Sequence, residues 1–178
     1  MKNVVSRSPD PGAGSPRKKA GARMPSGPHA RRERTAAVRA HQRGQAVFRS
    51  ILPEDMDWKP FAAFPASARL AVVVGQPSEP GPYVIRVKMP SGVKLMPHRH
   101  PEDRIYTIMS GVFYIGLGDE FDADELQAYP PGSVIVLPGN TSHFHWAKSG
   151  EYVAQVTAIG PLGLEYVNPS DDPRERGT

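Results

Sequence analysis

The sequence predicts one all-β domain of antiparallel strands, preceded by a basic extension that does not pack. Two observations lead to this prediction. After residue 51, six short runs rich in β-branched and aromatic residues alternate with turn-forming sequences. The first 45 residues are instead rich in Pro, Gly, Ser and basic residues, so burial there cannot offset the entropy lost on ordering. We expect a disordered extension over 1–45, the β domain over 46–170 and a polar tail over 171–178.

The expected strands are short and closely spaced. Turns are indicated by "PSEPGP", "MPSG", "YPPGS" and "KSGE", and six or more strands at such spacing favour a closed barrel or a sandwich. The acidic stretch 119–132 is expected to be a loop with at most one helical turn. The six expected strands lie at 70–75, 83–89, 104–111, 112–118, 133–139 and 151–160.

Charge is unevenly distributed along the chain. Residues 1–43 carry a net charge of +9 and residues 44–178 a net charge of −5, which together give the +4 of the whole chain. The basic isoelectric point near 9.5 is therefore a property of the extension, and the domain itself is acidic. Clustered Lys and Arg neutralise phosphates, but the extension has neither aromatic residues for stacking nor a known motif. We expect no nucleic-acid partner; the extension is either a solvated segment or lies upstream of a later start such as Met24.

Several classes of protein are excluded or disfavoured by what the sequence lacks. With no cysteine, the chain has no disulfide, no thiolate zinc site and no cysteine nucleophile. No apolar run reaches the roughly 18 residues of a membrane span. The N-terminus also lacks the apolar segment of a secretory signal. We therefore expect no membrane partner and a cytoplasmic location.

Histidines are the strongest chemical signal in the chain. Two of the six, His29 and His41, lie in the basic N-terminal part and are expected to be solvated. Side chains at i and i+2 of a strand point to the same face, so each remaining pair can project both imidazoles into one interior. A single His-x-His is as often a satisfied surface or core pair, but two pairs indicate a transition-metal site for Fe, Mn, Zn or Ni. The pairs are His98 with His100 and His143 with His145.

Around these histidines the chain resembles the cupin superfamily, specifically the small type-2 cupins with one conserved barrel. The first cupin motif is matched at the right spacing by Gly92, His98, His100 and Gly111. The second is matched by Gly132, Pro138 and His143. The resemblance covers residues 51–168 and implies a single jelly-roll barrel over 46–170. It also implies His98, His100 and His143 as metal ligands, and a homodimer.

Three positions depart from the cupin pattern: Arg104 replaces the Glu ligand, Asn140 a Gly, and Ala147 an Asn. Gly139 is expected to supply the flexibility of the turn instead. Arg104 matters more, because a guanidinium stays protonated and cannot ligate a metal. Three arrangements remain open. Glu102 or Asp103 reaches in toward the metal or pairs with Arg104, or Arg104 grips an anionic ligand, or it points outward.

The function expected from these residues is metal-dependent binding or conversion of a small, possibly anionic molecule. Three His ligands leave positions open for water, oxygen or substrate, which suits dioxygenase-like oxidation, Lewis-acid isomerisation or binding without turnover. The first hypothesis is a dioxygenase-like oxidoreductase; the alternative is a non-catalytic sensor or regulatory cupin. An isomerase would need a base such as Lys88 or Lys94.

Other side chains have assigned roles in these hypotheses. Arg104 and Tyr106 are the candidate catalytic residues, since Tyr106 can donate a proton or a hydrogen bond from the same face of its strand. His145 is a fourth ligand, a supporting hydrogen-bond donor or pocket lining. Tyr114 and Gln155 are possible lining residues.

Overall fold

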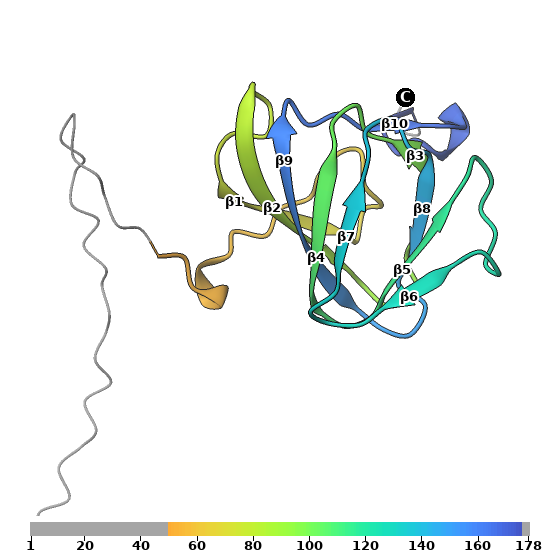
Figure 1. Cartoon of the computed structure of the whole chain (residues 1–178), viewed down its shortest axis with the longest axis horizontal. Helices are drawn as coiled ribbons and strands as arrows, with labels where there is room; N and C mark the ends of the chain where they lie inside the picture. Colours follow the sequence, from red (N-terminus) through yellow and green to blue (C-terminus); the bar gives the residue numbers. More distant parts are fainter. Residues whose placement is uncertain (1–49, 176–178) are drawn as a thin grey trace, which may run out of the picture. The chain divides into compact units, whose positions relative to one another are not determined.

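Two antiparallel sheets of five strands each make up the described part of the chain (Figure 1). The computed structural model describes residues 50–175, which fall in the second of two compact units, Phe48–Thr178. The first sheet has the order β1 (Arg69–Val74), β2 (Gly81–Met89), β9 (Tyr152–Gly160), β4 (Arg104–Ser110) and β7 (Val134–Leu137). The second has the order β10 (Glu165–Tyr166), β3 (Lys94–Arg99), β8 (His143–Trp146), β5 (Phe113–Leu117) and β6 (Gln127–Tyr129).

The predicted all-β class is confirmed. Helix in the described residues is limited to two 3₁₀ turns, η1 (Pro53–Asp55) and η2 (Pro169–Asp171), and no helix described here is long and apolar enough to cross a membrane. The acidic stretch 119–132 differs from expectation, because it contains β6, which pairs with β5, and no helical turn. The predicted disordered extension over 1–45 lies outside the described residues.

The core lies between the two sheets and follows from alternation along the strands. In β2 the side chains of Tyr83, Ile85, Val87 and Met89 are buried, while the three residues that alternate with them are only partly covered. β9 contributes its alternate residues from Tyr152 to Ala158 to the same interior. Because period-two burial leaves one face of each sheet inside, every second residue of a neighbouring strand points toward the same central space.

The turn before β8 corrects one sequence-based expectation. We expected Gly139 to supply its flexibility, but Asn140 itself adopts the left-handed conformation, with a φ of 59°. Asn tolerates this region better than most residues with a β-carbon, so the replacement of Gly preserves the turn that leads to His143. Gly139 has another role, since a β-carbon there would collide with the carbonyl oxygen of Pro101. Ala147, at the third departure, is fully buried.

Candidate metal centre

The four paired histidines converge on the inner face of the second sheet. His143 and His145 belong to β8, His98 belongs to β3, and His100 follows the end of β3. His98 lies directly opposite His143 in the antiparallel pairing of β3 with β8. None of the four is more than 5% exposed. The prediction that each pair shares one inward face is therefore confirmed, and the strand register brings the two pairs together.

Backbone carbonyls orient two of these rings. Nδ1 of His98 lies 2.8 Å from the carbonyl oxygen of Met96, and Nδ1 of His143 lies 2.8 Å from that of Thr141. A carbonyl oxygen only accepts hydrogen bonds, so Nδ1 carries the proton in both rings and Nε2 presents its lone pair. This is the tautomer that a metal-binding imidazole needs when it binds through Nε2.

Three imidazoles offer ligand atoms to one point. The possible ligand nitrogens of His98, His143 and His145 all lie within 4.8 Å of one another. Nε2 of each is buried and makes no hydrogen bond within the protein. Buried polar atoms without partners are costly, and an ion bound at about 2.0–2.1 Å would satisfy all three at once. These residues could hold a transition metal, and the imidazole donor set is compatible with Fe, Mn, Zn or Ni.

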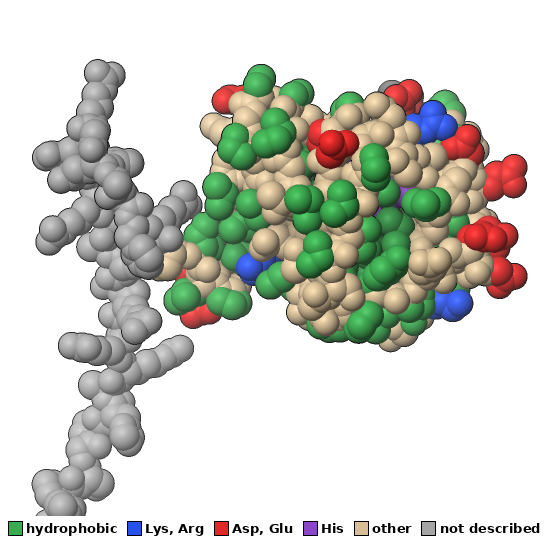
Figure 2. Space-filling model, viewed as in Figure 1, with side chains coloured by type: hydrophobic (Ala, Val, Ile, Leu, Met, Phe, Trp, Pro, Cys, Tyr) green, Lys and Arg blue, Asp and Glu red, His purple; other side chains and the backbone are tan. Residues whose placement is uncertain are grey.

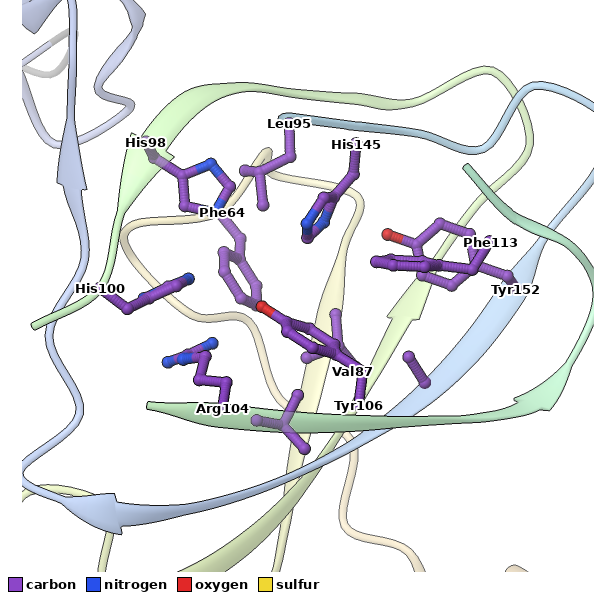
Figure 3. A pocket seen from close by; sticks show the side chains of 12 residues that line it. Phe64, Val87, Leu95, His98, His100, Arg104, Tyr106, Phe113, His145 and Tyr152 are labelled. Atoms are coloured by element: carbon purple, nitrogen blue, oxygen red, sulfur yellow. The ribbon is translucent and has the colours of Figure 1, made fainter. Parts of the chain in front are cut away.

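His100 lies beside this group. Its ring centroid is 4.9 Å from that of His98 and 5.3 Å from that of His143, and its Nδ1 is hydrogen-bonded to the carbonyl oxygen of Gly163. It points into the same cavity (Figure 3), but it is not among the three converging histidines. The converging group thus contains His145 where the resemblance implied His100, and ligation by His100 stays a prediction.

Arg104 points inward and pairs with Glu102. The Nε and Nη2 groups of Arg104 donate to Oε1 of Glu102 at 3.0 and 2.7 Å, and the two side chains are only 3% and 6% exposed. Of the three arrangements left open by the sequence, the structure contains the pairing of Arg104 with a carboxylate, that of Glu102. The outward orientation of Arg104 is wrong. Asp103 has a different partner, because its carboxylate accepts from the backbone N–H of Gly139 at 2.6 Å.

Both carboxylate oxygens of Glu102 are engaged away from the histidines. Oε1 also accepts from the hydroxyl of Tyr83 at 2.7 Å, and Oε2 accepts from the backbone N–H of Gly163 at 3.2 Å. Burial by itself lowers the pKa of Arg104, but Tyr106, Tyr83 and Glu102 together raise it above its usual value. Of these three, Glu102 is the ion-pair partner of Arg104. The ion pair therefore allows a guanidinium to lie beside the imidazoles.

A small cavity of about 20 Å³ lies next to the histidines, with room for about one ion or water molecule. Arg104 and Tyr106 face it from β4, opposite the histidines (Figure 3). The Tyr106 hydroxyl is buried without a hydrogen-bond partner, and burial raises the pKa of this phenol although Arg104 opposes the shift. Tyr106 is therefore a neutral proton or hydrogen-bond donor at neutral pH.

Two predicted lining residues do not face this cavity. Gln155 lies on the outer face of the first sheet, where its side-chain oxygen accepts from Nε of Arg86 at 3.1 Å. Tyr114 lies opposite Trp146 and immediately precedes the inward-facing Ile115, so its side chain is on the other face of β5. Both expectations were wrong because the parity of each strand places these residues on the opposite face.

Comparison with known proteins identifies the fold. No protein-family model and no curated protein sequence matches the chain. The polyketide cyclase RemF from Streptomyces resistomycificus is similar in structure, with a TM-score of 0.58 and 16% identity over 72% of this chain and 92% of that chain. An RmlC-like cupin from Ralstonia eutropha has a TM-score of 0.52 and 20% identity, covering 69% of this chain and 74% of its own. The fold is that of the cupin superfamily.

A third cupin-like structure is the DMSP lyase DddQ from Ruegeria pomeroyi, with a TM-score of 0.51 and 18% identity over 63% of this chain and 61% of that chain. Identities this low show the fold alone. The predicted cupin barrel is thereby confirmed, and its two sheets enclose the histidines as described above.

Sequence reasoning missed the residues that hold Glu102 in place. Tyr83 and Gly163 are 19 and 61 residues away from Glu102. No local pattern connects them, because β2 and the segment before β10 reach Glu102 only through the fold. Phe64, which lines the cavity from the segment preceding β1, was missed for the same reason.

The buried histidines are uncharged at neutral pH, as metal ligands must be. Burial lowers the pKa of all four histidines. For His143 burial lowers the pKa to about 4, with the Thr141 carbonyl opposing the shift and Arg104 adding to it. The imidazoles are therefore neutral at pH 7, and a metal has no proton to displace from them.

These shifts predict that the metal-free protein loses stability in mild acid. Unfolding returns the pKa of His143 from about 4 to its ordinary value of 6.5, so the unfolded chain binds more protons as the pH falls between these values. Stability is fully present above pH 6.5 and declines toward pH 4, by about 3 kcal/mol for this residue. Urea unfolding at pH 7.5 and pH 5 measures the change. His143→Gln should show a shallower pH dependence, and equal slopes for both proteins would contradict the assignment.

Proposed function

We propose that this protein is a metal-dependent cupin that binds and converts a small anionic molecule at its three-histidine centre. The observation that carries the proposal is the set of three converging, unpartnered Nε2 atoms with no carboxylate among them. Glu102, the nearest acidic candidate in the sequence, is held by Arg104. Three neutral imidazoles leave the charge of a divalent ion uncompensated, and the low dielectric of a buried site strengthens its attraction for an anion.

The surrounding side chains support conversion of the bound molecule. A metal at this centre would supply Lewis acidity and open positions for water, oxygen or substrate. The neutral Tyr106 hydroxyl is free to donate to a substrate oxygen, and the Arg104 guanidinium, paired with Glu102, lies beside the cavity. Apolar walls such as Phe113 exclude water. Dioxygenase-like oxidation is the reaction we propose for this centre, with iron as its metal.

A second candidate is a sensor-type cupin that holds a metal or ligand without turnover. It is favoured by the size of the cavity, about 20 Å³, and by the absence of a free carboxylate base among its described lining residues. The structural neighbours named as a polyketide cyclase and a DMSP lyase point instead to small-molecule chemistry, which supports the first proposal.

Oxygen uptake by the iron-loaded protein separates the two candidates. Across a panel of diketones and phenolic acids, we expect at least one substrate to stimulate oxygen consumption. Tyr106→Phe should lower the rate by about 10²–10⁴-fold, the usual contribution of a general acid, without changing the metal content. Binding of the panel without oxygen consumption would favour the sensor. If no member bound, the proposed preference for anionic small molecules would be wrong.

The homodimer implied by the cupin resemblance is also a proposal. Exposed apolar side chains gather on the outer face of the first sheet, over β4 and β7 (Figure 2). Such a face is typical of protein–protein contacts. These side chains are Ile105, Met109, Val134 and Val136.

A further inference from the structure

A second, larger hollow opens at the edge of the barrel. Its volume is about 350 Å³, against about 20 Å³ for the cavity beside the histidines. β7 ends the first sheet and β6 ends the second, and residues of both strands and of β5 line the hollow, which we call the edge groove.

Strand register places the edge groove directly beside the metal centre. In the pairing of β5 with β8, two groove residues lie opposite metal-centre histidines. In the pairing of β4 with β7, two more lie opposite the candidate catalytic residues. Residues opposed in an antiparallel pair project to the same face, so one row of apolar side chains separates the two spaces. The opposed pairs are Ile115 with His145, Leu117 with His143, Leu137 with Arg104, and Ile135 with Tyr106.

The groove is lined by apolar side chains of β5 and β7 together with polar ones such as Gln127 and Thr141. Leu117 is 62% exposed although it lies on the inward side of its strand, so part of its apolar surface is free to contact a ligand. The one charged residue among the described lining residues is an acid, Glu125. It disfavours a ligand carboxylate at the outer part of the groove and favours one directed toward the histidines.

We propose that the edge groove binds the body of the substrate, and that the substrate is an aromatic or similarly planar apolar acid whose carboxylate reaches the metal. This rests on the proposed function, since the acid end requires the metal centre. The histidine cavity has room for little more than an ion, whereas the groove is within the usual range of small-molecule sites. Ile115 and Leu137 are buried between the two spaces, so their side chains must turn aside to admit the carboxylate.

The test uses the full chain loaded with Co²⁺, with 2-naphthoate and acetate as probes. Fluorescence anisotropy measures naphthoate binding, and the visible Co²⁺ spectrum reports contact of either carboxylate with the ion. We expect naphthoate to bind at least tenfold more tightly than acetate, because its rings bury apolar surface in the groove. Both acids should perturb the Co²⁺ spectrum. Equal affinities, or naphthoate binding without a spectral change, would overturn the proposal.

A matched pair of variants locates the binding site. Leu117→Trp fills the groove, whereas Ile159→Trp adds the same bulk on the outer face of β9, at a residue of nearly equal exposure, 64% against 62%. We expect Leu117→Trp to weaken naphthoate binding at least tenfold and leave acetate unaffected, and Ile159→Trp to change neither. Equal effects of the two variants on naphthoate would overturn the groove assignment.

Failure of the proposed function gives a different result. In that case Co²⁺ does not bind at all. The anisotropy of naphthoate with the metal-free protein then tests separately whether the groove binds the apolar part of the ligand. Weaker naphthoate binding by Leu117→Trp than by Ile159→Trp would still support a binding site for the apolar part of the ligand in the groove. No difference between the variants would overturn it.

Discussion

Replacing His98 with alanine is expected to remove the bound metal from the purified protein. The substitution deletes one of three converging ligands, and no carboxylate can take its place because both oxygens of Glu102 are engaged. We expect the affinity for Zn²⁺ to fall by more than about 100-fold, since even the loss of a partner behind a ligand costs 10–100-fold. Dialysis against buffered Zn²⁺ followed by elemental analysis measures this loss.

His100→Ala is the informative companion to this variant. If His98, His143 and His145 suffice to hold the ion, His100→Ala keeps most of its metal. If His100 also ligates, as the cupin resemblance implies, both variants lose it. Full retention of metal by His98→Ala would contradict the site itself. Circular dichroism of each variant shows that the fold is intact.

Glu102→Ala is expected to lower the free energy of unfolding by about 3–5 kcal/mol, the usual cost of leaving one partner of a buried ion pair alone. The substitution leaves the buried Arg104 guanidinium without its carboxylate, and it also removes the acceptor for Tyr83 and Gly163. Urea unfolding at pH 7.5 measures the effect.

The exposed ion pair between Lys59 and Asp57 provides a matched control. Its nitrogen–oxygen distance is 2.6 Å, close to the 2.7 Å of the buried pair, but its side chains are 70% and 71% exposed. Asp57→Ala should therefore cost less than about 1 kcal/mol. A double variant, Glu102→Gln with Arg104→Met, should recover much of the stability lost in Glu102→Ala. Equal effects of Glu102→Ala and Asp57→Ala would contradict the role given to the buried pair.

Features that depend on local periodicity were predictable from the sequence. Short runs rich in β-branched and aromatic residues indicated β1, β2, β4, β5, β7 and β9, whereas β3, β8 and β10 were not among the six expected runs. The i, i+2 spacing of each histidine pair indicated its shared inward face. β6 was missed because Gln127–Tyr129 has no buried alternate residues and forms a strand only through its pairing with β5. Asn140 was missed because the sequence cannot distinguish which residue of Gly139–Asn140 adopts the left-handed conformation.

Features that depend on strand register were not predictable. Which three of the four imidazoles converge follows from the irregular pairing of β3 with β8, where the register shifts between Leu95 and His98. The choice of Glu102 rather than Asp103 as the partner of Arg104 follows from contacts with Tyr83 and Gly163, which are distant in sequence. The edge groove is likewise a product of where each sheet ends.

X-ray absorption spectroscopy of the Zn²⁺-loaded full chain tests most directly whether three imidazoles share one ion. We expect about one zinc per chain, with at least three imidazole nitrogens at about 2.0–2.1 Å. Solvent should fill the coordination position that the protein leaves open. A spectrum with only oxygen ligands, or a protein that takes up no zinc at neutral pH, would contradict the assignment of His98, His143 and His145 as a metal centre.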